Sequence, residues 1–156
     1  MEKLKPLDVG ALFHSVLFAY QQGLADVIKT DTTTVVNHYM MPYLDAMSAH
    51  TPFGHIETGD VEKTLRTFGD LLVRSDLASE VVVEKTENGF KFKVKGCVFA
   101  EHVHPMLNPK DVTCPYGLLA FYLAEKSSGK RIAKTLSEFT LTDSYTQIRF
   151  LETTES

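Results

Sequence analysis

Two cysteines and two histidines lie close together in the stretch GCVFAEHVHPMLNPKDVTCPYG, which begins at Gly96. Zinc takes four ligands in structural sites and prefers thiolate, imidazole and carboxylate donors. The composition of this stretch therefore predicts a zinc site, although the two cysteines lack the spacing of a zinc knuckle. The candidate ligands are Cys97, His102, His104 and Cys114, with the carboxylate of Glu101 as an alternative.

The neighbouring residues predict how these donors are presented. Pro105 disfavours a helical conformation for the residue before it, so we expect His102 and His104 on an extended segment with both rings on one side. Cys114 precedes a proline that suits the first position of a helix. We expect Cys114 to be the N-cap of that helix, where the helix dipole and free amide groups favour a thiolate.

The same donors are also compatible with roles that need no metal. Cysteine is among the most buried residue types, so Cys97 fits a small apolar position in the core, and the two histidines fit an exposed loop. A catalytic or redox pair of thiols is a third interpretation. His14 and His38 lie on or near the apolar faces of expected helices, which is typical of core or boundary residues. Motifs for a phosphate loop, a nucleophile elbow or a zinc helix are missing from the sequence.

The N-terminal half of the chain has the periodicity of helices. Apolar residues recur at three- and four-residue steps over about 7–29, which predicts an amphipathic helix. A second helix is expected over about 31–47, with a bend at Pro42. A third helix is expected over about 61–72, with its apolar residues on one face.

The C-terminal half alternates between strands and one helix. SEVVVEKTENGFKFKVKG predicts a β-hairpin with a two-residue turn at Asn88–Gly89, which would place Val83 opposite Val94 and also direct Val81 and Phe92 inward. CPYGLLAFYLAEKSSG predicts a helix that is apolar on all sides and therefore buried. A second hairpin is expected to turn near Asp143.

This order of elements predicts an α+β fold, in which helices pack on a four-stranded antiparallel sheet made of two hairpins with one buried helix between them. The chain is expected to form a single domain over 1–156, with N-terminal helices over about 7–75 and the sheet and buried helix over about 79–152. The net charge of −4 and the scattered basic residues argue against nucleic acid as a partner. The N-terminus lacks the pattern of a signal peptide and no segment resembles a membrane span, so we expect a cytoplasmic protein.

The C-terminal part of the sequence resembles the 4-vinyl reductase domain family, also described as predicted hydrocarbon-binding proteins. The resemblance lies in CVFAEH from Cys97, CPYGLLAFYLAEKSSGKRI from Cys114, and the closing hairpin. The resemblance covers about 58–152. It implies a fold related to the trafficking-particle subunits, a small apolar or aromatic ligand, frequent homodimers, and a zinc ion held by cysteines and a glutamate. A third cysteine of the family pattern is absent here, so His102, His104 or Glu101 would have to complete the ligand shell.

The resemblance leads to a hypothesis of function. We expect a non-catalytic domain that binds a hydrocarbon or aromatic molecule and carries a structural zinc ion, in a homodimer. Flat aromatic side chains are suited to line an apolar cavity. A metal-dependent enzyme with Glu101 as base, or an assembly subunit with a vestigial cavity, are the alternatives, and no flavin or nicotinamide motif supports a reductase. The residues expected to line the pocket are Phe99, Tyr116, Phe121 and Tyr122.

Overall fold

The computed structural model describes residues 6–28, 41–107, 112–133 and 137–151. Its helices are α1 (Pro6–Ile28), α3 (Met41–Ser48), α4 (Val61–Arg74), α5 (Ala100–Val103) and α6 (Pro115–Ser128), with the 3₁₀ turns η2 (Pro52–His55) and η3 (His104–Met106). Its strands are β1 (Glu80–Thr86), β2 (Gly89–Lys95), β3 (Ser137–Phe139) and β4 (Ser144–Arg149).

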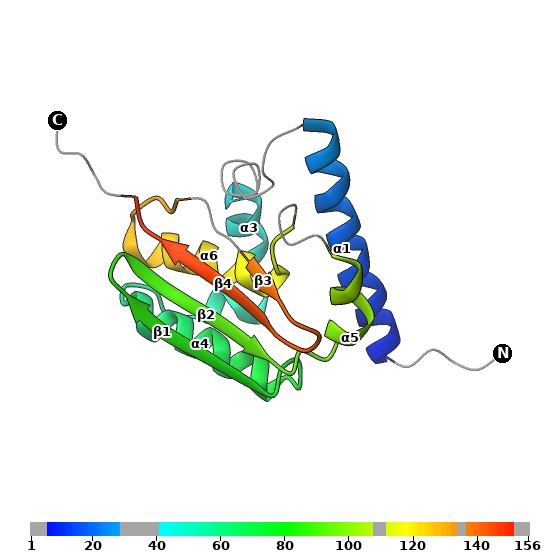
Figure 1. Ribbon diagram of the computed structural model, residues 1–156. Helices are drawn as coiled ribbons and strands as arrows, with labels where there is room; N and C mark the ends of the chain where they lie inside the picture. Colours follow the sequence, from blue (N-terminus) through cyan, green and yellow to red (C-terminus); the bar gives the residue numbers. More distant parts are fainter. Residues whose placement is uncertain (1–5, 29–40, 108–111, 134–136, 152–156) are drawn as a thin grey trace.

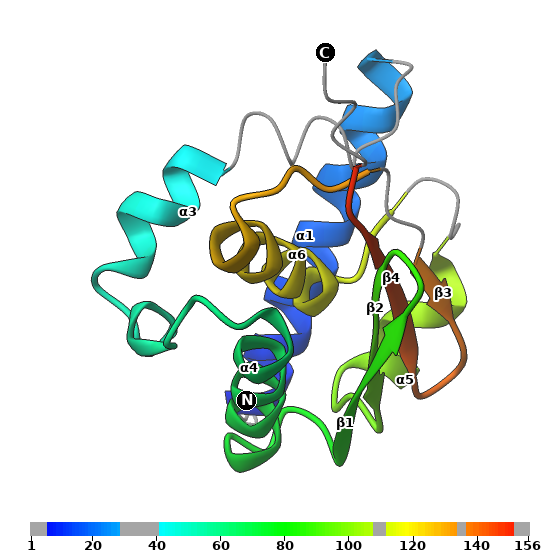
Figure 2. The ribbon, with the colours of Figure 1, turned by 90° about the vertical axis from the view of Figure 1, so that its left-hand side faces the viewer.

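The fold is of the predicted α+β class, with helices on one face of a four-stranded antiparallel sheet (Figures 1 and 2). The strand order is β1-β2-β4-β3, so the two hairpins join through the pairing of β2 with β4. α4 and α6 pack against the sheet, and α1 packs against α5. Within the described ranges, no helix is long and apolar enough to cross a membrane.

The turn of the first hairpin lies one residue earlier than the predicted Asn88–Gly89 turn. Gly89 is the first residue of β2 and pairs with Thr86, so the turn consists of the two residues between them. A Cβ atom on Gly89 would lie 2.0 Å from the backbone oxygen of Ile148. Gly89 is therefore needed inside the sheet, where β4 approaches closely, rather than in the turn.

The predicted pairing of Val83 with Val94 is consequently wrong, because Val83 lies opposite Phe92. The difference amounts to two residues, and side chains alternate between faces with a period of two. The predicted inward face is therefore retained. Val83, Phe92 and Val94 are buried, whereas Val81 is partly buried.

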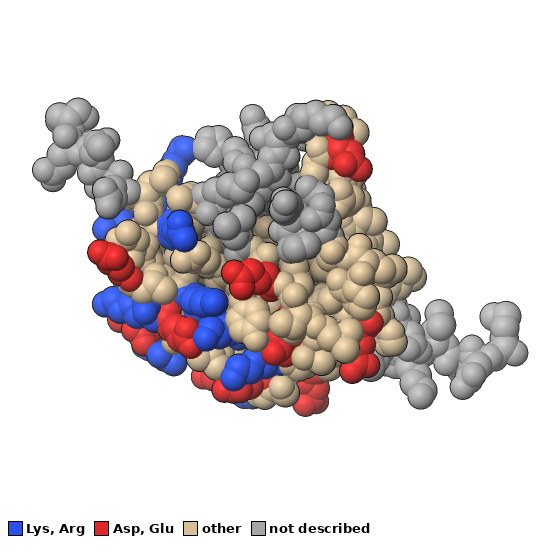
Figure 3. Space-filling model, in the orientation of Figure 1, with Lys and Arg blue, Asp and Glu red and all other residues tan. Residues whose placement is uncertain are grey.

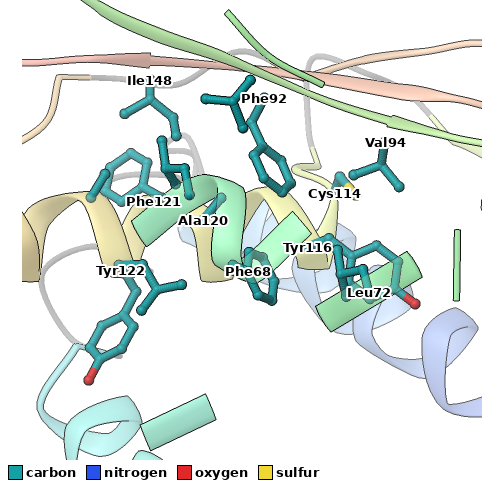
Figure 4. Close-up of a cluster of buried hydrophobic side chains, with 14 of the residues drawn as sticks. Phe68, Leu72, Phe92, Val94, Cys114, Tyr116, Ala120, Phe121, Tyr122 and Ile148 are labelled. Atoms are coloured by element: carbon teal, nitrogen blue, oxygen red, sulfur yellow. The ribbon is translucent and has the colours of Figure 1, made fainter. Parts of the chain in front are cut away.

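Helix α6 is the buried helix between the hairpins. Pro115 is its first residue, and Gly129 ends it in a left-handed conformation with φ of 65°. Gly117 allows α6 to approach β4, since a Cβ atom there would lie 2.1 Å from Oγ1 of Thr146. The buried apolar side chains of α6, most of which Figure 4 labels, are Tyr116, Ala120, Phe121, Tyr122, Leu123 and Ala124.

Helix α4 covers the sheet beside α6 with the apolar face that its periodicity predicts. Asp60 is its N-cap and accepts a hydrogen bond of 2.9 Å from the amide of Lys63. Leu65, Phe68 and Leu72 are buried on the inner face. The ring of Phe68 stacks on Phe92 of β2 with centroids 5.7 Å apart, which ties the helix to the middle of the sheet.

Helix α1 has a narrow buried face, although it is the longest of the described helices. His14, Phe18 and Gln21, at helical spacing, are its buried side chains. The Gln21 amide donates to the carbonyl of Thr113 at 3.0 Å and accepts from the Thr113 amide at 2.8 Å. These two buried hydrogen bonds attach α1 to the segment that precedes α6.

The predicted second helix, over about 31–47, lies in part outside the described residues. Its described portion is α3, in which Pro42 is the second residue. Proline is well tolerated in the first turn of a helix, where its missing amide hydrogen would have no partner. The bend expected at Pro42 concerns residues before Met41, which are not described.

Candidate functional site

A group of buried rings joins α1 to the segment after β2 and to the second hairpin. His14 and Phe18 pack edge to face, with ring centroids 5.1 Å apart. The ring of His14 also lies 5.0 Å from that of Phe99 and 5.7 Å from that of Tyr116. Phe18 continues the group to Phe139, at 5.9 Å. The group, called the His14–His104 cluster below, comprises His14, Phe18, Phe99, His104, Tyr116 and Phe139.

His104 enters this cluster from η3, with its ring 5.0 Å from that of Phe139. Its Nδ1 lies 2.7 Å from the carbonyl oxygen of Thr140. Because a carbonyl oxygen can only accept, the neutral ring carries its hydrogen on Nδ1, which leaves a free lone pair on Nε2. The backbone of the second hairpin thus fixes both the tautomer and the orientation of this imidazole.

Both imidazoles of the cluster have a buried Nε2 atom without a hydrogen-bond partner among the described residues. Only 5% of His14 and 6% of His104 is exposed. Burial, and secondarily the nearby His104, lower the pKa of His14 to about 4. Burial also lowers the pKa of His104, although the hydrogen bond to Thr140 opposes this. Both rings are therefore neutral near pH 7.

The two cysteines are buried free thiols close to this cluster. Burial raises the pKa of Cys97 to about 11 and also raises the pKa of Cys114. Cys114 is the N-cap of α6 as predicted, and its sulfur accepts a hydrogen bond from Ser144 at 3.1 Å. The predicted thiolate is wrong, because desolvation outweighs the helix dipole and the Ser144 hydrogen bond.

The prediction that His102 and His104 share an extended segment is also wrong. His102 lies in α5, and His104 begins η3 with φ of −56° and ψ of −37°. A helical turn places residues two apart on different sides, so His104 points inward while His102 and Glu101 are exposed. Across the described ranges, no group of three or more His, Cys, Asp or Glu side chains could hold a metal ion. The predicted ligand set is therefore not assembled.

An apolar groove lies beside the cluster, between α1 and the described residues 103–107 and 112. Its volume is about 310 Å³. Phe18 and Val103 contribute both to this groove and to a small buried apolar group with Val112. The ring of Phe18 therefore separates the groove from His14. The groove, called the α1 groove below, is lined by Ser15, Phe18, Ala19, Gln22, Val103, Met106, Leu107 and Val112.

The four residues predicted to line a ligand pocket fall into two pairs. Phe99 and Tyr116 belong to the His14–His104 cluster, and Figure 4 shows Tyr116 pointing toward α1. All four lie in the main hydrophobic core, and Phe121 and Tyr122 lie outside the His14–His104 cluster. The Tyr122 hydroxyl points toward α3 and donates a hydrogen bond to Asp45, so it anchors that helix. The described α1 groove is lined by none of the four.

Sequence reasoning assigned His14 to packing, and its burial confirms that role but leaves its Nε2 atom unexplained. Sequence reasoning did not single out Phe18. One signal in the sequence marks this region: His14 and Gln21 share a helix face with Phe18, whereas the opposite face is entirely apolar. When a long helix buries its more polar face, its apolar face is left exposed and is suited to contact another molecule.

The chain matches no protein-family model and no curated protein sequence. Its function therefore has to be inferred from the geometry of its own residues.

Proposed function

We propose that this protein is a binding module for a small apolar molecule, which it holds in the α1 groove. The observation that carries the proposal is the groove itself, with a volume of about 310 Å³. Small-molecule sites in proteins have volumes of about 300–1,000 Å³ and mostly apolar walls. The groove lies at the lower end of that range, which suits a molecule with one or two rings.

The chemistry of the lining favours an apolar occupant. Phe18 and Val103 form its inner wall, and Met106, which is 73% exposed, stands at its mouth. Methionine is flexible and polarizable, so it adapts to ligands of different shapes. Ser15 contributes little polarity, because its hydroxyl already donates a hydrogen bond to the carbonyl of Ala11 at 2.9 Å.

The thiols and the carboxylate near the groove support binding rather than catalysis. Cys97 has its pKa raised to about 11, and the pKa of Cys114 is raised as well, so both stay protonated at neutral pH and are poor nucleophiles. A metal-dependent reaction needs about three converging protein ligands. Among the described residues, Glu101 and His102 are exposed and form no such group.

The test measures binding of 1-methylindole, an apolar two-ring probe, by isothermal titration calorimetry, in the wild type and in a variant whose groove is filled by a larger side chain. Ala19 is exposed on α1 and lines the groove, so Ala19→Phe should abolish binding by occupying the space. Ala46→Phe places the same ring on an exposed position of α3 and should leave binding unchanged. Equal affinity in the wild type and Ala19→Phe, or no binding by the wild type at all, would reject the groove as the site.

We also propose that the exposed apolar face of α1 binds a second copy of the chain. Leu12, Phe13, Val16, Leu17 and Tyr20 recur at helical spacing and are each at least half exposed. Monomeric proteins rarely leave contiguous apolar patches of more than a few hundred Å² uncovered. An aromatic side chain alone covers about 150–250 Å². Two of the five, Phe13 and Tyr20, are aromatic, so with the three aliphatic side chains the patch supplies a substantial part of the roughly 800 Å² that each partner contributes to a standard interface.

The charge distribution favours a second copy over a membrane surface. Helix α1 contains no Lys or Arg, and in Figure 3 the charged residues gather over the sheet rather than over α1. Helices that lie on anionic membranes carry basic residues beside their apolar face. A face without charge is complementary to itself, which suits a twofold dimer.

Sedimentation equilibrium tests the dimer. The wild type should have twice the mass of the 17.5 kDa chain. Val16→Lys places a charge in the apolar face and should give a monomer, whereas Asp70→Lys on the exposed side of α4 should remain dimeric. A monomeric wild type would reject the dimer, and association with lipid vesicles instead would assign the face to a membrane.

A further inference from the structure

The His14–His104 cluster contains two buried polar atoms that no other described residue contacts through a hydrogen bond. The Nε2 atoms of His14 and His104 are buried and form no hydrogen bond among the described residues. Most buried polar side-chain atoms in proteins form hydrogen bonds, and an unpaired one destabilises the fold. Two such atoms on neighbouring imidazoles, in surroundings made of aromatic rings, indicate a polar partner from outside the chain.

The tautomer of His104 defines what that partner must supply. Its Nδ1 donates to the carbonyl oxygen of Thr140 at 2.7 Å, so its Nε2 can only accept a hydrogen bond. The partner must therefore carry an O–H or N–H donor. The rings near the two imidazoles are those of Phe18 and Phe139. Asp143 lies near enough to His104 to raise its pKa, but this carboxylate is only partly buried. It already accepts hydrogen bonds from the Gly96 amide and the Tyr145 hydroxyl, so it is not free to balance a buried cation. The partner group is therefore uncharged.

The cluster is adjacent to the α1 groove. The ring of Phe18 lines the groove, and it also packs on His14 at 5.1 Å and on Phe139 at 5.9 Å. Val103, which precedes His104 in the chain, lines the groove as well. A ligand in the groove would therefore have to displace the Phe18 side chain to reach the two imidazoles.

We propose that the ligand of the α1 groove is an uncharged apolar molecule with an O–H or N–H group, and that His104 Nε2 accepts a hydrogen bond from this group with His14 Nε2 beside it. This inference rests on the proposed function, because it concerns the same ligand. It adds the polar end of that ligand and the two residues that recognise it. Apolar walls supply affinity, and a buried acceptor rejects molecules that lack the donor.

The test compares indole with 1-methylindole, which differ by the N–H donor. The wild type should bind indole about 5–10-fold more tightly, as expected for one hydrogen bond to a buried acceptor. His104→Phe should remove this preference and keep the affinity for 1-methylindole, and His14→Phe should reduce the preference. His50→Phe, at an exposed position after α3, should behave like the wild type.

Each outcome decides either the proposal or the function on which it rests. Equal affinities of the wild type for the two indoles would overturn the polar recognition and leave the apolar groove intact. A preference for indole that persists in His104→Phe would overturn the role of that imidazole. If neither compound bound, the proposed function would fail together with this inference. Zinc chloride that bound the wild type tightly but not His104→Phe, without any preference for indole, would assign the imidazoles to a metal instead. The comparison of two ligands on the wild type stays decisive even if a variant does not fold.

Discussion

Buried His14 predicts that this protein loses stability as the pH falls below about 6.5. In the unfolded chain its pKa has the ordinary value of 6.5, whereas burial lowers it to about 4 in the folded protein. Between these values the unfolded chain binds more protons, so a falling pH favours unfolding. The contribution of His14 to the free energy of unfolding is complete above its unfolded-state pKa. This contribution is lost progressively as the pH falls to the folded-state pKa of about 4.

The size of this effect follows from the two pKa values of His14. One pKa unit corresponds to about 1.36 kcal/mol, so the full shift corresponds to about 3 kcal/mol. By about pH 5 the protein should have lost about 2 kcal/mol of that amount. His104, whose pKa is also lowered, contributes in the same direction. Asp45 and Asp143 also have lowered pKa values, and their contribution is lost at more acidic pH.

Urea unfolding at about pH 7.5 and about pH 5 measures the effect in the wild type and in His14→Phe. Phenylalanine preserves an aromatic ring beside Phe18 and Phe99 but does not titrate. The loss of stability between the two pH values should be smaller by about 2 kcal/mol in this variant. His50→Phe should lose as much as the wild type. If His14→Phe lost the same free energy as the wild type, the neutral buried imidazole would be refuted.

Three further predictions concern the attachment of α1, the packing of α6 and the exposed glycine Gly23 in α1. Gln21→Ala removes the hydrogen-bond partner of both the amide and the carbonyl of Thr113. It should lower the free energy of unfolding, measured in urea, by about 2–4 kcal/mol. Hydrogen exchange of the Thr113 amide should also become faster. Gly117→Ala overpacks the contact with β4 and should destabilise by about 1–3 kcal/mol or more. Gly23→Ala meets no atom within 4 Å and should stabilise by about 0.5–1 kcal/mol.

The sequence was sufficient to predict the elements whose pattern is local. The start of α6 at Pro115, its end at Gly129 and the inward face of the first hairpin all follow from short-range rules. The exact turn was beyond such rules, because Gly89 is required by the backbone of Ile148 in a strand about sixty residues later. Only the assembled sheet reveals that requirement.

The candidate site was less accessible from the sequence. Pro105 was taken as evidence against a helical His104, yet the chain turns helically there and buries Val103 and His104 together. The thiolate at Cys114 failed for a similar reason, since burial cannot be judged from a capping position alone. The unpaired nitrogen of His14 depends on which residues face α1 across the core, and no local pattern encodes this.

The most direct measurement is the ¹⁵N NMR spectrum of the histidine rings, recorded with and without indole. The Nε2 lone pair of His104 has no hydrogen-bond partner among the described residues, so its resonance should shift when indole donates a hydrogen bond to it. The resonance of the Nδ1 atom, which is held by Thr140, should keep its protonated position. 1-Methylindole should bind without shifting Nε2. An Nε2 resonance that indole leaves unchanged at saturating concentration would contradict the proposed site.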